Sequence, residues 1–223
     1  MSVETPLLPV LPMGAGHAAP SPAQRRRLVA RARQLAWLGL GWHVVEAAVA
    51  VTAGVVAGSV ALVGFGADSL IEAAAGIVVL WLMADNRSAS PPAERRAQQL
   101  IAASFVVLAG YIGVEAVRDL VAGHHPDASW VGIGLAVVTL ATMPPLAIAK
   151  RRVGDQLGSS ATASESRQTM LCAYLSAALL VGLLANAAAG LWWADPATGL
   201  VIAAVALREA RDAWRGRACG CCT

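Results

Sequence analysis

The chain has 223 residues, of which 57% are hydrophobic and only 14% are charged, whereas soluble domains carry about 25% charged residues. The length accommodates six membrane spans of about 20 residues each but no large second domain. The formal net charge of +3 does not indicate a nucleic-acid partner, because helices placed in lipid leave no folded basic face. We expect an all-α polytopic membrane protein whose first partner is the lipid bilayer.

Six apolar stretches are separated by polar, glycine-containing or proline-containing segments. In chain order, the expected spans are residues 34–55, 59–83, 98–121, 128–149, 167–190 and 195–207. Residues 1–24, with five prolines, are expected to be a disordered tail. Residues 25–215 are expected to form the six-transmembrane-helix bundle, and residues 216–223 a short Cys-rich cytoplasmic tail. Residues 153–166 are rich in Gly, Ser, Ala and Thr, which predicts a flexible cytoplasmic loop.

The basic residues predict the orientation of the bundle. When the N-terminus is placed inside and six spans are threaded, sixteen of the seventeen Lys and Arg residues fall inside, and only Arg118 falls outside. This is the distribution of the positive-inside rule, and five or seven spans would place at least one basic cluster on the wrong side. Both termini are therefore expected in the cytoplasm, with the protein in the cell membrane.

The second expected span carries two acidic residues at membrane depth, where ionisable groups cost roughly 2.5–3.5 kcal/mol each. Asp68 and Glu72 are spaced i, i+4, so both carboxylates lie on one helix face, about one turn apart. Two carboxylates this close in a low dielectric need a cation or a proton between them. We interpret them as a divalent-cation site that also exchanges protons. The alternative is a structural pair bonded to neighbouring helices.

Polar side chains also follow one face of the fifth span, where Gln168, Cys172 and Ser176 recur every four residues. A thiolate together with carboxylates suits zinc or a similar ion. Cys172 and Gln168 are therefore candidate metal ligands alongside the two acids of the second span. Alternatively, small polar residues at these positions let helices pack closely and hydrogen-bond.

Two further ionisable groups, His43 and Glu46, share a face of the first span. An unpaired acid at mid-membrane suggests a proton relay or an accessory ligand, whereas His43 is also compatible with a packed, hydrogen-bonded role. In the third span, the preferred interpretation of Glu115 and Asp119 beside Arg118 is an interfacial salt bridge. No phosphate-binding loop and no nucleophile–base pair is visible in the sequence, so neither an enzyme nor a bound cofactor is expected.

Residues 58–62 (GSVAL) and 66–72 (GADSLIE) resemble the second helix of the cation diffusion facilitator family, whose members are six-span exporters of zinc and related divalent ions. In that family, an acidic pair on the second helix joins a His/Asp pair on the fifth helix in a tetrahedral site. The fifth-helix positions correspond to Gln168 and Cys172, neither of which is the usual His or Asp. The resemblance covers residues 25–215 and implies a short subgroup that lacks the C-terminal cytoplasmic domain.

The resemblance implies export of a divalent cation, Zn²⁺ or Co²⁺, in exchange for protons. The ion would bind between the second and fifth spans. Relatives that carry the cytoplasmic domain are typically dimers, so a homodimer is an open expectation. The alternative is a non-transporting membrane metal sensor or scaffold with a degenerate cation site.

Overall fold

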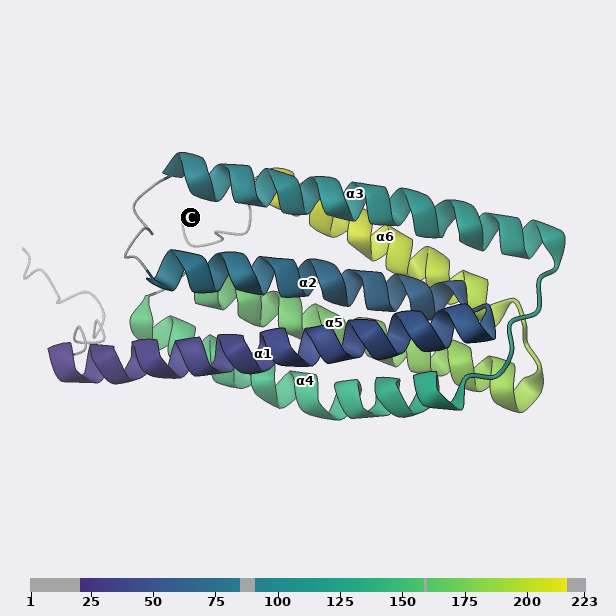
Figure 1. Cartoon of the computed structure of the whole chain (residues 1–223), viewed down its shortest axis with the longest axis horizontal. Coiled ribbons are helices and arrows are strands. Elements are labelled where there is room, and N and C mark those ends of the chain that lie inside the picture. Colours follow the sequence, from purple (N-terminus) through teal and green to yellow (C-terminus); the bar gives the residue numbers. More distant parts are fainter. Residues whose placement is uncertain (1–20, 85–90, 159, 216–223) are drawn as a thin grey trace, which may run out of the picture.

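The computed structural model describes residues 21–84, 91–158 and 160–215, which form six α-helices (Figure 1). The helices are α1 (Pro22–Ala57), α2 (Val60–Ala84), α3 (Pro91–Ala122), α4 (Trp130–Leu157), α5 (Ser160–Ala189) and α6 (Ala194–Trp214). The chain runs back and forth along the bundle, so α1 begins and α6 ends toward the same end. The expected all-α bundle of six helices is confirmed.

The expectation of a flexible loop over residues 153–166 is wrong. α4 continues to Leu157, Gly158 ends it with a φ of 61°, and α5 begins at Ser160. A left-handed residue at a helix C-terminus favours glycine, because a Cβ there is strained. The Ser166 hydroxyl donates to the carbonyl of Ala147 at 2.8 Å and so ties α5 to α4. These tertiary contacts hold the small residues of the segment in a helix.

α1 begins well before the expected span. The Ser21 side chain accepts a hydrogen bond from the backbone N–H of Gln24. Pro22 occupies the first turn of the helix, where a backbone N–H has no partner within the helix, so the N–H that proline lacks is not missed. The arginine-rich stretch is therefore part of the helix. The tail predicted at residues 1–24 is wrong for residues 22–24, which belong to α1. Residues 1–20 of that tail, and the tail predicted at residues 216–223, lie outside the described residues.

The bundle exposes large apolar side chains and buries a set of charged and polar ones among its apolar core. Exposed large side chains include Trp37, Leu38, Val56, Val107 and Val121, whereas the buried polar groups include His43, Glu46, Asp68, Glu72 and Lys150. Among the described residues, three helical stretches are long and apolar enough to cross a membrane, namely Pro22–Ala57, Trp130–Leu157 and Glu165–Ala189. This arrangement suits lipid as the solvent, because charged groups then turn toward the bundle interior.

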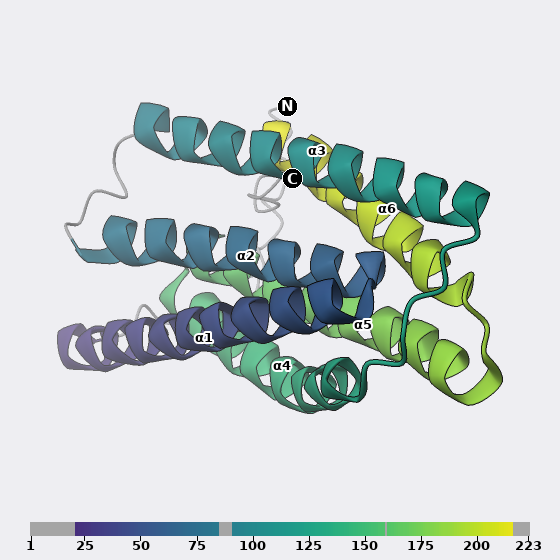
Figure 2. The ribbon, with the colours of Figure 1, turned by 45° about the vertical axis from the view of Figure 1, so that its right-hand side comes forward.

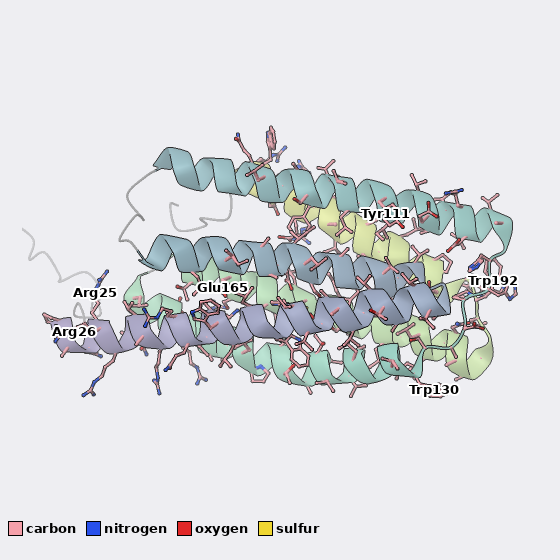
Figure 3. The ribbon with its side chains drawn as sticks, viewed as in Figure 1. Arg25, Arg26, Tyr111, Trp130, Glu165 and Trp192 are labelled. Carbon is pink, nitrogen blue, oxygen red and sulfur yellow. The ribbon has the colours of Figure 1, made fainter. Side chains whose placement is uncertain are left out.

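The two ends of the bundle differ in chemistry (Figure 3). Arg25 and Arg26 lie at one end, which is called the arginine end below, and Trp130 and Trp192 lie at the other. Indole side chains are enriched at membrane–water interfaces, and arginines gather on the cytoplasmic side. That the arginine end faces the cytoplasm stays a prediction.

The helices associate as three close pairs, α1 with α2, α4 with α5 and α3 with α6 (Figures 1 and 2). One hydrophobic cluster joins the first two pairs to α6 and includes Phe65, Met143 and Cys172. A second cluster joins α3 to α6 around Ile112. The buried ionisable groups of α1, α2, α4 and α5 therefore lie between the α1–α2 pair and the α4–α5 pair.

Gly54 lets α1 approach α2 closely. A Cβ at Gly54 would lie 2.8 Å from the backbone nitrogen of Val63, whereas a Cβ at Gly41 of the same helix would meet nothing within 4 Å. We expect Gly54→Ala to lower the stability of the bundle by roughly 1–3 kcal/mol, because the two backbones must separate. Gly41→Ala should leave it unchanged or higher. The measurement is the melting temperature of both variants in detergent by circular dichroism. An equal change in the two variants would contradict the prediction.

Candidate metal centre

Four buried side chains from three helices converge between the α1–α2 and α4–α5 pairs. They are His43 and Glu46 of α1, Glu72 of α2 and Cys172 of α5. One ligand atom of each residue lies within 4.8 Å of the corresponding atoms of the others. Imidazole nitrogen, thiolate sulfur and carboxylate oxygen are the ligand atoms of zinc sites. The four side chains can therefore approach one ion with small adjustments.

The local helix geometry explains why these residues meet. His43 and Glu46 are three residues apart, so they project from the same face of α1. Glu72 is presented by α2, the helix that packs most closely on α1. Cys172 is fully buried on α5, inside the main hydrophobic cluster. The group therefore depends on the contact between two helix pairs and not on any single helix.

Glu46 is a carboxylate with a full set of contacts. Its contacts are Trp42 Nε1 at 3.2 Å, Ser69 Oγ at 2.9 Å, His43 Nδ1 at 3.3 Å, Cys172 Sγ at 3.7 Å, and Thr139 Oγ1. These partners come from α1, α2, α4 and α5. A buried charge is tolerated when hydrogen bonds satisfy its lone pairs. Glu46 is thereby held in one position.

Glu72, in contrast to Glu46, has a carboxylate oxygen without a hydrogen-bond partner. Its Oε2 lies 3.1 Å from Nδ1 of His43, yet this oxygen is buried and makes no hydrogen bond of acceptable geometry. The same His43 nitrogen is 3.3 Å from Glu46, so one imidazole faces two carboxylates. An unsatisfied buried carboxylate oxygen is destabilising. A cation bound within the group would remove that cost.

Among the ligands expected from the sequence, Glu72 and Cys172 lie in this group, and so do both groups of the first span. Asp68 is buried but is not a member. Four residues of helix rise about 6 Å, which displaces Asp68 from Glu72 along the axis. Gln168 lines a small pocket together with His43 and Glu72. The role of each residue as a metal ligand stays a prediction.

Several polar residues around the centre did not figure in the sequence interpretation. Ser69 and Thr139 are hydroxyl donors to Glu46, and Lys150 forms a buried ion pair with Glu165. A threonine hydroxyl within an uncharged span was the available signal for Thr139, although Thr142 of the same span carries one as well. No such signal exists for Lys150, because it belongs to a basic cluster at the end of a span. By contrast, the expected salt bridge of Arg118 is present, at 2.7 Å from Glu115.

Residues 36–215 match the family described as the cation efflux transmembrane domain. A protein of Synechocystis sp. described as an uncharacterized transporter is 28% identical over 177 residues, which is 76% of this chain and 57% of that relative. The chain therefore spans little more than half of the relative's length. Together with the exposed apolar side chains of the bundle, the family match establishes a multi-pass membrane protein, for which the cell membrane is the usual location.

The hydroxyl of Thr139 gives a test of the Glu46 network. Thr139→Val removes one donor and leaves a buried carboxylate less satisfied, so we expect a loss of roughly 1–3 kcal/mol in unfolding free energy. Thr142→Val on the same helix is the matched control, because that exposed hydroxyl bonds only to carbonyls of α4. The measurement is denaturant unfolding in detergent. If both variants lose the same stability, Thr139 does not support Glu46.

Proposed function

Since the chain belongs to the cation efflux family, we propose that it exports a divalent cation of the zinc or cobalt type across the cell membrane in exchange for protons. The observation that carries the proposal is the buried group of His43, Glu46, Glu72 and Cys172, in which one Glu72 oxygen has no hydrogen-bond partner. Ionisable groups inside a membrane mark ion pathways, because they are otherwise costly. The function is transport and not catalysis.

The chemistry of the ligands supports the choice of ion. One nitrogen, one sulfur and two carboxylate ligands form a borderline-soft set, which favours Zn²⁺ or Co²⁺. Mg²⁺ and Ca²⁺ prefer oxygen ligands alone. We assign Glu72 and Cys172 as direct ligands, and His43 and Glu46 as ligands contributed by α1. Asp68 and Gln168 are proposed to contact the ion as it moves toward or away from the centre.

Proton exchange follows from the same ligands. Carboxylates, imidazole and thiol bind either a metal ion or a proton, so loading the metal releases protons and reprotonation expels the metal. The positive-inside pattern supports cytoplasmic termini, which places the arginine end in the cytoplasm. Relative movement of the helix pairs would expose the centre to the two sides in turn. A homodimer is part of the proposal, by likeness to the family.

The second candidate is a membrane metal sensor or scaffold that binds the ion without moving it. One observation favours it: Glu46 is held by partners from four helices, which stiffens the centre. The two candidates agree on metal binding and differ on flux. Measurement of both binding and flux on the same preparation separates them.

The flux test uses the full chain in proteoliposomes, with a metal indicator and a pH indicator inside. Wild type should move Zn²⁺ and protons in opposite directions, and Glu72→Gln should reduce Zn²⁺ flux at least about tenfold, because it removes a charged ligand. Glu115→Gln is the matched control, since that partly exposed acid pairs with Arg118 away from the centre. Its flux should equal that of wild type.

Three outcomes would each overturn one part of the proposal. Zn²⁺ binding without flux in wild type would favour the sensor. Undiminished flux in the Glu72→Gln variant would place the transport site elsewhere. Flux of Zn²⁺ with no opposing proton movement would retain export and remove the exchange.

Cys172 provides a spectroscopic test of the ligand set. In a chain whose tail cysteines Cys219, Cys221 and Cys222 are replaced by Ser, Cys172 is the one remaining cysteine. Bound Co²⁺ should then show thiolate-to-metal charge-transfer absorption, which Cys172→Ser should abolish. Ser176→Ala is the control, because the Ser176 hydroxyl donates to the carbonyl of Cys172 and Ser176 is not one of the four grouped residues. Retention of the band without Cys172 would contradict the assignment.

A further inference from the structure

A buried ion pair lies beside the candidate metal centre, toward the arginine end. Lys150 of α4 is only 2% exposed, and its Nζ lies 2.8 Å from Oε1 of Glu165 and 3.1 Å from Oγ1 of Thr169, both on α5. Lysine is almost never fully buried unless it is paired. No residue of the proposed metal ligand set takes part in this pair. The pair is therefore distinct from the proposed metal centre.

The pair shares a small pocket with two of the four proposed ligands, His43 and Glu72. The pocket is lined by residues of four helices, among them His43, Glu72, Gly76, Lys150, Glu165 and Gln168. Glu165 precedes Cys172 by about two turns of α5, or roughly 10 Å along the axis. Figure 3 shows Glu165 nearer to Arg25 and Arg26 than to Trp130 and Trp192. The pair therefore stands between the arginine end and the metal centre.

α1 leaves room for the lysine. A Cβ at Gly39 would lie 2.7 Å from Nζ and 3.4 Å from Cε of Lys150, so any side chain at residue 39 would displace the ammonium. The Lys150 side chain thus extends from α4 to the surface of α1 while its charge is bound to α5. One cation on a flexible stem fills the junction of three of the helices that line the pocket.

We propose that the Lys150–Glu165 pair is the gate of the cation path at the arginine end, with the Lys150 ammonium occupying the place that a divalent cation takes beside Glu165 before it reaches Glu72. The inference rests on the proposed function for the identity of the ion. An ammonium carries one charge and a divalent cation carries two, so the latter competes favourably for one carboxylate. The displaced ammonium then repels the cation, which favours its movement to the centre.

The test measures access to Cys172 from the arginine end and does not depend on transport. The chain with Ser in place of Cys219, Cys221 and Cys222 is placed in inverted membrane vesicles. The rates at which a membrane-impermeant cationic methanethiosulfonate and a neutral analogue of similar size modify Cys172 are compared. Wild type should react slowly with the cationic reagent. Lys150→Met keeps an unbranched stem of similar length to the lysine methylenes and removes the ammonium, so the ratio of cationic to neutral rates should rise about tenfold.

Two further variants complete the experiment. Arg151→Met removes an equal charge from the adjacent residue, whose side chain is exposed and lies 4.0 Å from Asp155 on the surface. This control should leave the ratio at the wild-type value. The double variant Lys150→Met/Glu165→Gln removes both charges of the pair, so its ratio should fall below that of Lys150→Met alone.

The gate is disproved if Lys150→Met leaves the ratio unchanged, if Arg151→Met raises it equally, or if the double variant matches Lys150→Met. A raised ratio in a chain that moves no Zn²⁺ would retain the gate and remove the transport proposal. Zn²⁺ flux with an unchanged ratio would retain the transport proposal and disprove the gate.

Discussion

The carboxylate of Glu46 is the point at which the two helix pairs around the centre are joined. Its partners come from both members of each pair, through Trp42, Ser69, Thr139 and Cys172. A bundle in lipid gains little from apolar association between its helices, because lipid tails are as apolar as the side chains. Close backbone approach and interhelical hydrogen bonds must fix the arrangement instead. Gly54 allows close backbone approach within the α1–α2 pair. Glu46 accepts the hydrogen bonds that join the two pairs.

The other buried charged groups differ from Glu46 in how many hydrogen bonds the protein gives them. Glu46 is satisfied by protein, whereas an oxygen of Glu72 is not. Among the described residues, Lys150 pairs with Glu165 and lies beside the hydroxyl of Thr169. The described buried charges therefore range from the fully bonded carboxylate of Glu46 to the unpaired oxygen of Glu72, which we propose as a ligand of the ion. A purely structural network would be expected to satisfy every member, since partial satisfaction costs stability.

The sequence was sufficient for the six-helix architecture, because lipid imposes long apolar stretches that hydropathy reveals directly. It was also sufficient to place Glu72 and Cys172 near each other, through the spacing of polar residues on two spans. It did not show that His43 and Glu46 of α1 lie in the same group as Glu72 and Cys172. That grouping depends on how α1 is rotated against α2, which is set by contacts such as that of Gly54 with Val63. Residues 153–166 were misjudged because small residues read locally as a loop, whereas Ser166 is held in α5 by its bond to α4.

The position of the centre between two helix pairs has a mechanical consequence. His43, Glu46 and Glu72 belong to the closely packed α1–α2 pair, and Cys172 belongs to the α4–α5 pair. In the proposed mechanism, a rotation that moves one pair away from the other would lengthen the distances from Cys172 to His43, Glu46 and Glu72 while leaving those three together. An ion bound by all four would be released by that movement without separation of the helices within either pair. The bond from Thr139 to Glu46 crosses the same boundary, so the hydroxyl that stabilises the closed arrangement is also a contact that such a rotation has to break.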